Sequence, residues 1–348
     1  MPPPVPVGRT RRLVACVALG LGLTVALLPA TPARAATIEV FPGDSIQAAV
    51  NSASPGDTIL VHAGTYKQSV SIKTDDLTIE GEGASDSGTV LKPSKSANQC
   101  QKGKSGFCAN GGSTSDGTVS GLRITGFKIT GFKQSGILLT ETKGAVVSDV
   151  LLGSNKGSGV VASSSSGTRV VNSTLKLNGG PGIYIADSAR AQATIRNDEI
   201  SGNPFGIFLR DSAVGDVAES TVEHNCIGIA VLNTTEKVTT HGYDIHGNTV
   251  DDNTRYCPAG NGLPATSGIG VAVAGAHSIT VRRNTIQGNR ASRSVPAHGG
   301  VVLGSFGKLV PKDDTIVHNH LRRNDPNIRY DGTGSGNVIA HNSCSPAC

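Results

Sequence analysis

The residue types that could carry out chemistry lie close together in the middle of the chain. Asp187 and Asp211 flank Arg210, with Arg190 and Asp216 nearby in the sequence. Elimination within a uronide needs a cation for the enolate, a base for the C5 proton and an acid for the leaving oxygen. Arg210 has the charge for the first role, and one carboxylate could be the base if its pKa is raised. Two carboxylates equally suit glycoside hydrolysis, and the alternative without chemistry is a surface ion pair of Arg210 with either Asp187 or Asp211.

Two aromatic residues belong to the same region. Tyr184 and Phe208 are each the third residue of a segment that begins with glycine and an aliphatic residue, at Gly182 and Gly206. Strand alternation points the aliphatic residues inward and both aromatics outward, in one column. An exposed aromatic pair would bind sugar rings by apolar stacking. The alternative is that a surface loop covers the pair as a secondary core. The same alternation adds three residues to the column: Leu138, Val161 and Ala230.

A second polar group lies in HGYDIHGN, residues 241–248. Asp244 and His246 share a strand face there, so a bound metal is conceivable. The spacing matches no helix-borne zinc motif, which favours a solvated turn. The full group is His224, His241, Asp244, His246, Asp251 and Asp252, and the alternating pair His318 and His320 receives the same interpretation.

These residues sit on a repeating framework. Segments that begin with glycine and an aliphatic residue start at Gly136, Gly159, Gly182 and Gly206, with unit lengths of 23, 23, 24 and 22 residues, and the next two units are 40 and 32 residues long. A second marker, an aliphatic residue followed three positions later by Asn, keeps the same phase. It occurs at Leu152/Asn155, Leu175/Asn178, Ile200/Asn203, Val222/Asn225, Val250/Asn253, Ile286/Asn289 and Leu321/Asn324.

A unit this short cannot bury its own apolar face, so the repeat predicts one turn of a solenoid per unit. The short strand-like pieces favour an all-β fold, a right-handed parallel β-helix, in which inward aliphatic residues stack into a continuous core. Asn at a corner tolerates left-handed backbone and can bond to its copy on the next turn. The segment TRYCPAGNGLPATS, residues 254–267, interrupts the repeat. Insertions in solenoids often border the binding face, so this loop is expected to wall a cleft.

A short amphipathic helix is expected at the start of the solenoid. Ile46, Ala49, Val50 and Ala53 follow helical spacing, after a possible cap at Asp44 or Ser45. An open β-helix exposes core and strand edges at its first turn. The helix is therefore predicted to cover that end.

The entry region resembles that of the pectate-lyase-like superfamily, which includes pectate lyases, alginate lyases and mannuronan epimerases. The resemblance rests on IQAAVNSASPGDTILVHAGTY followed by VSIKTDDLTIEGEG and extends, through the later turns, over nearly all of the chain after the leader. It implies the fold specifically and polysaccharide chemistry only in general. The Asp-Pro-His-Asp motif of the epimerases and an evident calcium cluster of the pectate lyases are both missing. No cofactor is predicted, with calcium left open.

The first residues are typical of an export signal. Basic residues precede an apolar run, Leu13–Leu28, and Ala33-Arg34-Ala35 is a cleavage motif, so residues 1–35 are expected to be removed. Thr10-Arg11-Arg12 leaves a twin-arginine route open beside the ordinary secretory one. The predicted organisation is a signal peptide at 1–35, a strand and capping helix at 36–56 and the β-helix at 57–348.

The remaining chain is nearly neutral and rich in paired cysteines. The signal carries four arginines and no acidic residue, which leaves 27 basic against 26 acidic residues. Nucleic acid is therefore excluded as a partner, and after cleavage no membrane association is expected. Six cysteines remain, as suits an oxidising compartment. Their proximity suggests the pairs Cys100–Cys108, Cys226–Cys257 and Cys344–Cys348.

Three functions follow from these observations. The favoured one is a secreted, monomeric bacterial-type lyase or epimerase of an acidic polysaccharide, with Asp187, Arg210 and Asp211 as catalytic residues and Tyr184 and Phe208 as sugar-binding residues. The second is a secreted β-helix that binds glycans or serves as a scaffold without catalysis. The third, a copper-accessory β-helix, is disfavoured because the only methionine is the initiator.

Overall fold

The computed structural model describes Met1 and residues 35–95, 99–260 and 262–348. The export signal predicted for residues 1–35 lies, apart from its two end residues, outside the described part of the chain. Ala35–Cys348 forms one compact unit. Among the described residues, no helix is long and apolar enough to cross a membrane.

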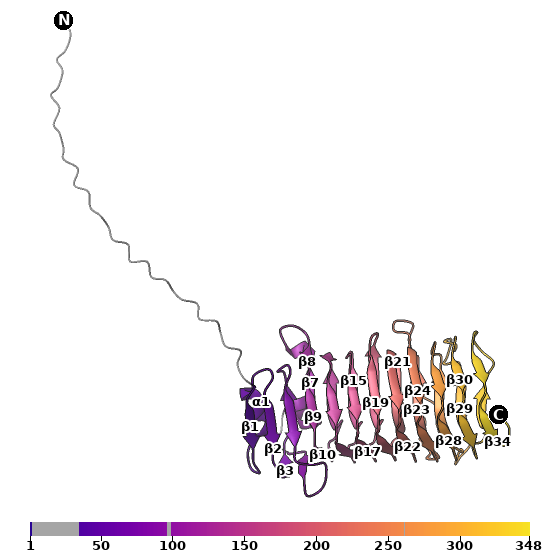
Figure 1. Ribbon diagram of the computed structural model, residues 1–348, viewed down its shortest axis with the longest axis horizontal. Coiled ribbons are helices and arrows are strands. Elements are labelled where there is room, and N and C mark those ends of the chain that lie inside the picture. The colour runs from indigo at the N-terminus through magenta and orange to yellow at the C-terminus, as the bar shows by residue number, and fades with distance from the viewer. Residues whose placement is uncertain (2–34, 96–98, 261) are drawn as a thin grey trace. The chain divides into compact units, whose positions relative to one another are not determined.

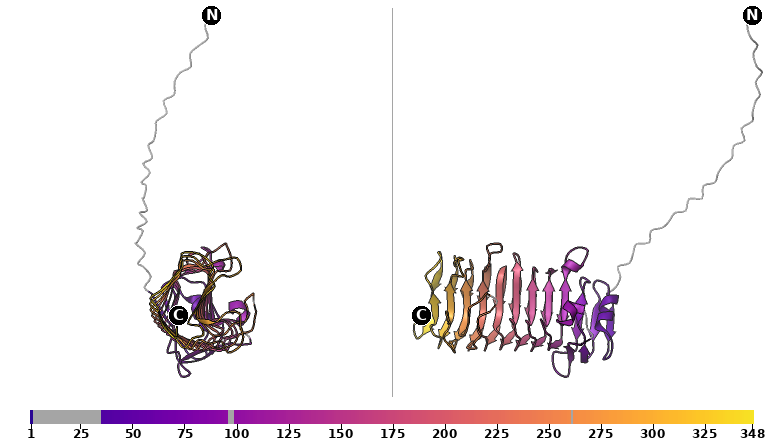
Figure 2. Two further views of the ribbon diagram at one scale, coloured as in Figure 1. Left: turned by 90° about the vertical axis from the view of Figure 1, so that its right-hand side faces the viewer. Right: turned by 180° about the vertical axis from the view of Figure 1, so that it is seen from behind.

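Ala35–Cys348 coils into a right-handed parallel β-helix (Figure 1). Each turn contributes one short strand to each of three sheets, named here sheets C, A and B in the order in which the chain visits them. All pairings between named strands are parallel, and successive turns superimpose in a view along the solenoid (Figure 2, left). The predicted fold class is confirmed.

The strands of each sheet are short. Sheet C contains β4 (Val70–Ile72), β7 (Phe107–Asn110), β11 (Ile137–Thr140), β15 (Val160–Ser163), β18 (Ile183–Ser188), the first part of β21 (Phe205–Ala218), β23 (Ile227–Leu232), β26 (Ile269–Ala274), β29 (Gly299–Gly304) and β32 (Ile328–Tyr330). Sheet A contains β1 (Thr37–Val40), β2 (Thr58–Val61), β5 (Thr78–Gly81), β9 (Arg123–Thr125), β13 (Val146–Ser148), β16 (Arg169–Val171), β19 (Ala193–Arg196), the second part of β21, β24 (His241–His246), β27 (Thr280–Arg282), β30 (Thr315–Val317) and β33 (Val338–Ala340).

Sheet B contains β3 (Gly64–Lys67), β6 (Thr89–Lys92), β10 (Phe127–Thr130), β14 (Leu151–Gly153), β17 (Thr174–Lys176), β20 (Glu199–Ser201), β22 (Thr221–Glu223), β25 (Thr249–Asp251), β28 (Thr285–Gln287), β31 (His320–Arg322) and β34 (Ser343–Ser345). A small outer pair is formed by β8 (Val119–Ser120) and β12 (Thr142–Lys143). The helical elements among the described residues are α1 (Ile46–Ser52), α2 (Gln99–Gly103) and a 3-10 turn (Gly111–Ser113).

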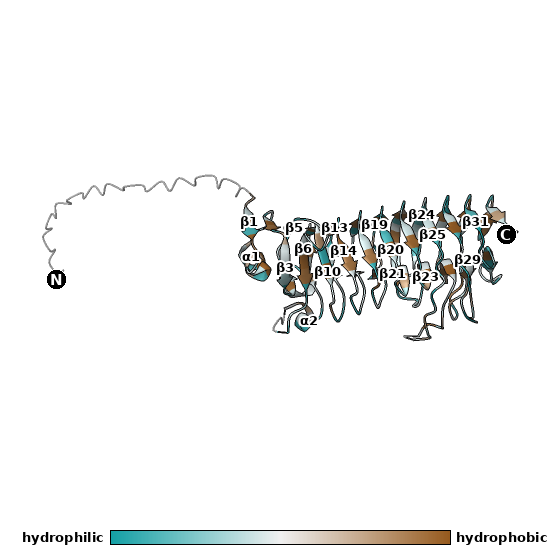
Figure 3. Ribbon diagram, turned by 90° about the horizontal axis from the view of Figure 1, so that it is seen from below, coloured by the Kyte–Doolittle hydropathy of each residue, from teal (hydrophilic) through white to brown (hydrophobic). Residues whose placement is uncertain are grey.

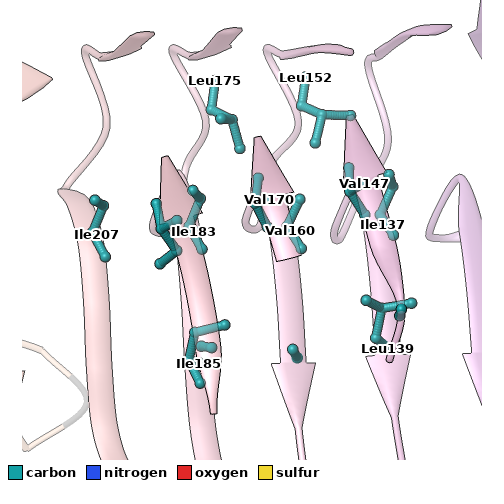
Figure 4. Close-up of a cluster of buried hydrophobic side chains, with 14 of the residues drawn as sticks. Ile137, Leu139, Val147, Leu152, Val160, Val170, Leu175, Ile183, Ile185 and Ile207 are labelled. Atoms are coloured by element: carbon teal, nitrogen blue, oxygen red, sulfur yellow. The ribbon is translucent and has the colours of Figure 1, made fainter. Parts of the chain in front are cut away.

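The inner core follows the predicted alternation. Ile137, Val160, Ile183 and Ile207 are register partners on successive strands of sheet C and are fully buried (Figure 4). The equivalent inward positions of sheets A and B are filled in the same way, as Val147 and Val170 or Leu152 and Leu175 show. Removal of this surface from water is the main stabilising contribution to the fold.

The asparagine marker forms a buried ladder at the corner between sheets B and C. Each Asn Nδ2 donates to Oδ1 of the Asn one turn later, over 2.9–3.3 Å, through Asn155, Asn178, Asn203, Asn225, Asn253, Asn289 and Asn324. The marker glycine belongs to the same corner. A Cβ on Gly206 would lie 2.6 Å from the Gly228 carbonyl oxygen and 3.1 Å from Asn225 Nδ2. The stacked corner predicted for Asn178 and Asn203 is confirmed.

Two features of the corners differ from expectation. The left-handed residue is the one before the ladder asparagine, for example Leu177 (φ 56°) or Gly202 (φ 71°). A second ladder lies between sheets A and B and changes residue type along its length. It runs through Ser173, Asp198, Ser220, Asn248, Asn284, Asn319 and Asn342.

Helix α1 (Ile46–Ser52) covers the first turn, as predicted. Ser45 caps it, because its side chain accepts a bond of 3.1 Å from the Ala48 amide. Ile46, Ala49 and Val50 are buried against the core end. Gln47 fixes the helix to β4 by bonding both the amide and the carbonyl of Ser71.

The six cysteines of Ala35–Cys348 form the three pairs suggested by proximity, Cys100–Cys108, Cys226–Cys257 and Cys344–Cys348. The second pair attaches the 254–267 insertion to the corner that precedes β23. Loops project from the solenoid on the side where β21, β23 and β29 are labelled (Figure 3).

Candidate functional site

The outer face of sheet C brings the predicted aromatics into one column. Tyr184 on β18 pairs in register with Phe208 on β21, which pairs with Ala230 on β23. Leu138 and Val161 precede them on earlier turns. The next outward column places Arg210 beside Ala186. The outward column predicted for Leu138, Val161, Tyr184, Phe208 and Ala230 is confirmed.

The aromatic rings stack, but they are not equally exposed. The Tyr184 and Phe208 ring centroids are 5.1 Å apart at an interplanar angle of 13°. Phe205, which the sequence interpretation missed, stacks on the other side of Phe208 at 4.6 Å and 10°. Phe208 is only 6% exposed, so the expectation of two exposed rings is wrong for Phe208. Tyr184 is half-buried, and this burial raises the pKa of its hydroxyl to about 12, although the charge of Arg210 opposes the shift.

Phe208 is buried because a second hydrophobic cluster covers it. This outer cluster consists of Phe208, Ile227, Ala230, Leu232 and Ile269, with Tyr184, Phe205, Leu263, Ala272, Ala274, Val302 and Phe306 packed against it. Leu263 comes from the 254–267 insertion and Phe306 from the segment after β29. The covering loop considered as an alternative therefore exists, and the insertion does border this face.

Arg210 is held between the two predicted carboxylates. Its Nη2 lies 3.2 Å from Asp187 Oδ1, and its Nε lies 3.3 Å from Asp211 Oδ2. Its guanidinium carbon is 5.4 Å from the centroid of the Tyr184 ring. The ion pair considered from sequence is thus present with both aspartates, and it positions the cation beside the half-buried tyrosine.

The two carboxylates have different surroundings. The Asp187 side chain is about half exposed. Asp211 is 2% exposed and accepts bonds from the Thr234 amide (2.7 Å), the Thr235 amide (3.2 Å) and the Thr234 hydroxyl. Asp211 therefore anchors the segment that follows β23, and Asp187 is the carboxylate that faces solvent.

A hollow of about 510 Å³ lies beside Arg210, and neither Asp187 nor Asp211 is among the residues that line it. Tyr184, Phe208 and Arg210 contribute to it, together with Pro181, Phe205, Thr234, Gly262, Leu263 and Phe306. The lining combines an aromatic surface, one cation and the hydroxyls of Tyr184 and Thr234. Such a site could hold a ring with one apolar face and an anionic substituent.

The second polar group predicted from sequence, around residues 241–248, lies on sheet A. Asp216, Asp244 and His246 have potential ligand atoms within 4.8 Å of one another, and Asp216, although near Arg210 in sequence, belongs here. Arg196 lies 2.7 Å from Asp216, Arg282 lies 2.7 Å from Asp244, and His246 lies 2.8 Å from Asp216. A divalent cation would compete with two guanidinium groups for these oxygens, so the donor set fits an ion-pair network better than a metal site.

The other polar residues of this group are dispersed. His241 Nδ1 is bonded to the Thr239 carbonyl, Asp251 accepts from Gln287, and His224 lies beside Glu223. Asp252 and His318 occupy left-handed corner positions. His318 and His320 had been expected to alternate along one strand. Because His318 lies at a corner, the two residues do not share a strand. The His318 ring stacks on His341 instead.

Comparison with known proteins identifies the fold class first. Solved structures of similar fold include three enzymes at low sequence identity. Pectate lyase Pel9A gives a TM-score of 0.56 at 14% identity and covers 90% of this chain and 81% of its own. The alginate lyase from Paenibacillus sp. str. FPU-7 gives 0.56 at 17% identity, covering 88% and 99%. The DFA-IIIase from Arthrobacter chlorophenolicus A6, without its lid and in complex with GF2, gives 0.62 at 11% identity, covering 90% and 99%.

The family follows from the sequence itself. Residues 65–227 and 135–345 match the family described as "Right handed beta helix region", and the chain belongs to this family. The resemblance to the pectate-lyase-like fold is confirmed. None of the curated proteins matches the sequence.

Proposed function

We propose that this protein is an exported, carbohydrate-active β-helix that binds an acidic polysaccharide over the outer face of sheet C. The observation that supports it most is Arg210 held over the half-buried Tyr184 ring in a hollow of about 510 Å³. The tyrosine offers an apolar face to a sugar ring, and the guanidinium can bind a uronate carboxylate in forked geometry. The similar folds of a pectate lyase and an alginate lyase support this substrate class.

The reaction that we favour is uronide β-elimination or C5 epimerisation. Both begin with removal of the proton at C5, and Asp187 is the solvent-facing carboxylate beside Arg210. Arg210 would stabilise the charge that develops on the substrate carboxylate. In elimination the C4–O4 bond then breaks and O4 takes a proton from solvent, whereas in epimerisation solvent returns a proton to the opposite face of C5. Asp211 would act as a positioning residue, because Oδ2 lies 3.3 Å from Arg210 Nε and both carboxylate oxygens accept hydrogen bonds from the Thr234–Thr235 segment.

Non-catalytic glycan binding is the second candidate. The pairing of Arg210 with two carboxylates favours this candidate. Arg210 can still bind an anionic ligand in this arrangement, whereas the ion pair with Arg210 makes Asp187 a poorer base. The two candidates predict the same binding site and differ only in turnover.

Titration calorimetry of residues 36–348 with uronate oligosaccharides tests the binding site. Tyr184→Ala and Arg210→Lys should each weaken binding about tenfold, because they remove ring stacking and the forked contact. Val161→Ala, one turn earlier in the same column, and the exposed Arg190→Lys are matched controls and should bind as wild type does. Wild-type affinity in both site variants, with unchanged melting curves, would refute the site.

Turnover is tested separately. New absorbance from unsaturated uronide products, or an epimerised product by NMR, should appear with the wild type and disappear with Asp187→Asn while binding is kept. Parallel assays with added calcium and with a chelator test the remaining cofactor question. Binding without any product would select the glycan-binding candidate.

Export and a monomeric state belong to the same proposal. The apolar leader with its cleavage motif and the three cysteine pairs support an oxidising compartment outside the cytoplasm. Size-exclusion chromatography with light scattering of the secreted protein, together with N-terminal sequencing, tests both statements. A start at Ala36 and the mass of one chain are expected.

A further inference from the structure

A second hollow of about 310 Å³ lies farther along the same face of sheet C. Its floor is formed by outward residues of β23, β26 and β29, and its walls by Leu263 and Phe306. The polar side chains that line it are few, namely Thr266, Ser305, Arg329 and Asp331. The hollow shares Phe205, Leu263 and Phe306 with the uronate site proposed above.

The hollow exists because small residues replace large ones in the outward column. Phe208 is followed on successive turns by Ala230, Ala272 and Val302. The neighbouring column continues from Leu232 to Ala274. Protein interiors are normally close-packed, so a pure covering role for the loops would call for larger side chains here.

The walls are fixed by backbone bonds. Gly260 and Leu263 bond each other in both directions over 2.9–3.0 Å, and Phe306 and Leu309 do the same over 2.8–3.0 Å. The Cys226–Cys257 pair attaches the first wall to the solenoid. A hollow between two fixed walls, mainly apolar and of this size, has the character of a preformed ligand site.

An arginine lies beside each end of this pair of columns, and the two differ in their pairing. Arg210, in the same column as Leu232, is paired with Asp187 and Asp211. Arg329, the register partner of Val302, continues the column of Ala230 and Ala272, and no described carboxylate lies within 4.0 Å of its guanidinium. Asp331 is turned to the loop, where it accepts bonds from the Ser305 amide and hydroxyl and from Thr333.

We propose that this hollow binds the aliphatic chain of an anionic amphiphile, with the chain over Ala230 and Ala272 and the anionic head at Arg329. A sugar ring is disfavoured because its hydroxyls would face an almost wholly apolar lining. A hydrocarbon chain loses no hydrogen bonds there, and Arg329 can bind a carboxylate. The source of such a chain that we propose is a free fatty acid, and a chain carried by a neutral sugar is the alternative that the experiment tests.

Titration calorimetry of residues 36–348 with octanoate, decanoate and dodecanoate, each below its micelle concentration, tests the chain. The dissociation constant should fall about fourfold for each methylene added. Ala272→Leu should fill the floor and abolish binding, whereas Val161→Leu, in the same column outside the hollow, should not change it. No dependence on chain length, or unchanged binding by Ala272→Leu, would overturn the proposal.

Arg329→Met tests the head group. It should weaken decanoate binding about tenfold and leave decyl maltoside, which has the same chain and no charge, unchanged. If Arg329→Met bound decanoate and decyl maltoside as tightly as the wild type does, the proposed contact of an anionic head with Arg329 would be wrong. That result would indicate a chain carried by a neutral sugar. Uronate titration of Ala272→Leu separates this site from the proposed function, because that binding should persist when decanoate binding is lost.

Discussion

The inner core and the outer cluster are built from opposite faces of the same strands, yet they pack differently. Inside, Ile183, Ile207 and Ile229 occupy equivalent positions and are completely buried. Outside, the equivalent column changes from Tyr184 and Phe208 to alanine, valine and finally arginine, and two hollows remain beside it.

The difference shows where this fold leaves room for function. An inward residue has the same neighbours on every turn, so the same residue type is suitable throughout. An outward residue meets whichever loop passes over it, and the outer cluster on sheet C is covered in part by Leu263 of the 254–267 insertion. The candidate sites therefore lie where the repeat is interrupted.

The largest effect should come from opening the inner core at its covered end. Ile46→Asp combined with Val50→Asp places two charges in the buried face of α1, and we expect a loss of about 4–6 kcal/mol in the free energy of unfolding, with aggregation. Chemical denaturation and light scattering measure both. A soluble, monomeric double variant of normal stability would show that α1 does not cover the core.

A smaller loss should follow from breaking the asparagine ladder. Asn203→Leu leaves the Asn178 amide, the Leu175 carbonyl and Asn225 without their partner, which should destabilise the protein by about 3 kcal/mol. Glu199→Leu, on the exposed face of the preceding strand, is the control and should change stability by less than about 0.5 kcal/mol. Equal melting temperatures for Asn203→Leu and the wild type would argue against a stabilising ladder.

The inside of the solenoid was largely predictable from sequence, and the outside only in part. The spacing of Gly and Asn was sufficient for the fold, the first ladder and the outward column, because these depend on the period alone. The second ladder has no single residue type as its marker, because it begins with Ser173, Asp198 and Ser220 and continues with Asn, so the sequence did not predict it. The burial of Phe208 and the anchoring role of Asp211 depend on Leu263 and Thr234, which lie in insertions without a period.

The buried carboxyl of Asp198 should make the stability of the solenoid depend on pH. It is 1% exposed in the second ladder, its Oδ2 has no hydrogen-bond partner among the described residues, and burial raises its pKa to about 8. Because the pKa is raised in the folded state, the contribution of Asp198 to the free energy of unfolding is fully present below the ordinary pKa of 3.8. This contribution is lost as the pH rises from 3.8 towards 8. Asp198→Asn, which carries no charge, should therefore match the wild type near pH 4 and be more stable by a few kcal/mol near pH 9.

Denaturation of both proteins from pH 4 to 9 checks this difference. Asp314, whose pKa burial raises to about 7, adds a similar slope to both curves, so the difference between them reports Asp198 alone. A constant difference across the range would mean that Asp198 does not titrate with folding.

The smallest change in stability should come from truncation of Leu263, which forms a wall of both hollows. Leu175→Ala in the inner core removes a completely buried side chain and should destabilise the protein by about 2–5 kcal/mol, because its neighbours cannot close the cavity. Leu263→Ala makes the same chemical change where the side chain is half-buried beside both hollows, and we expect less than about 1 kcal/mol. The same variant should nevertheless weaken decanoate binding severalfold, since the wall contacts the proposed chain. Equal losses of stability from the two variants would mean that the outer cluster is a second core, and that its loops cover sheet C without forming a binding site.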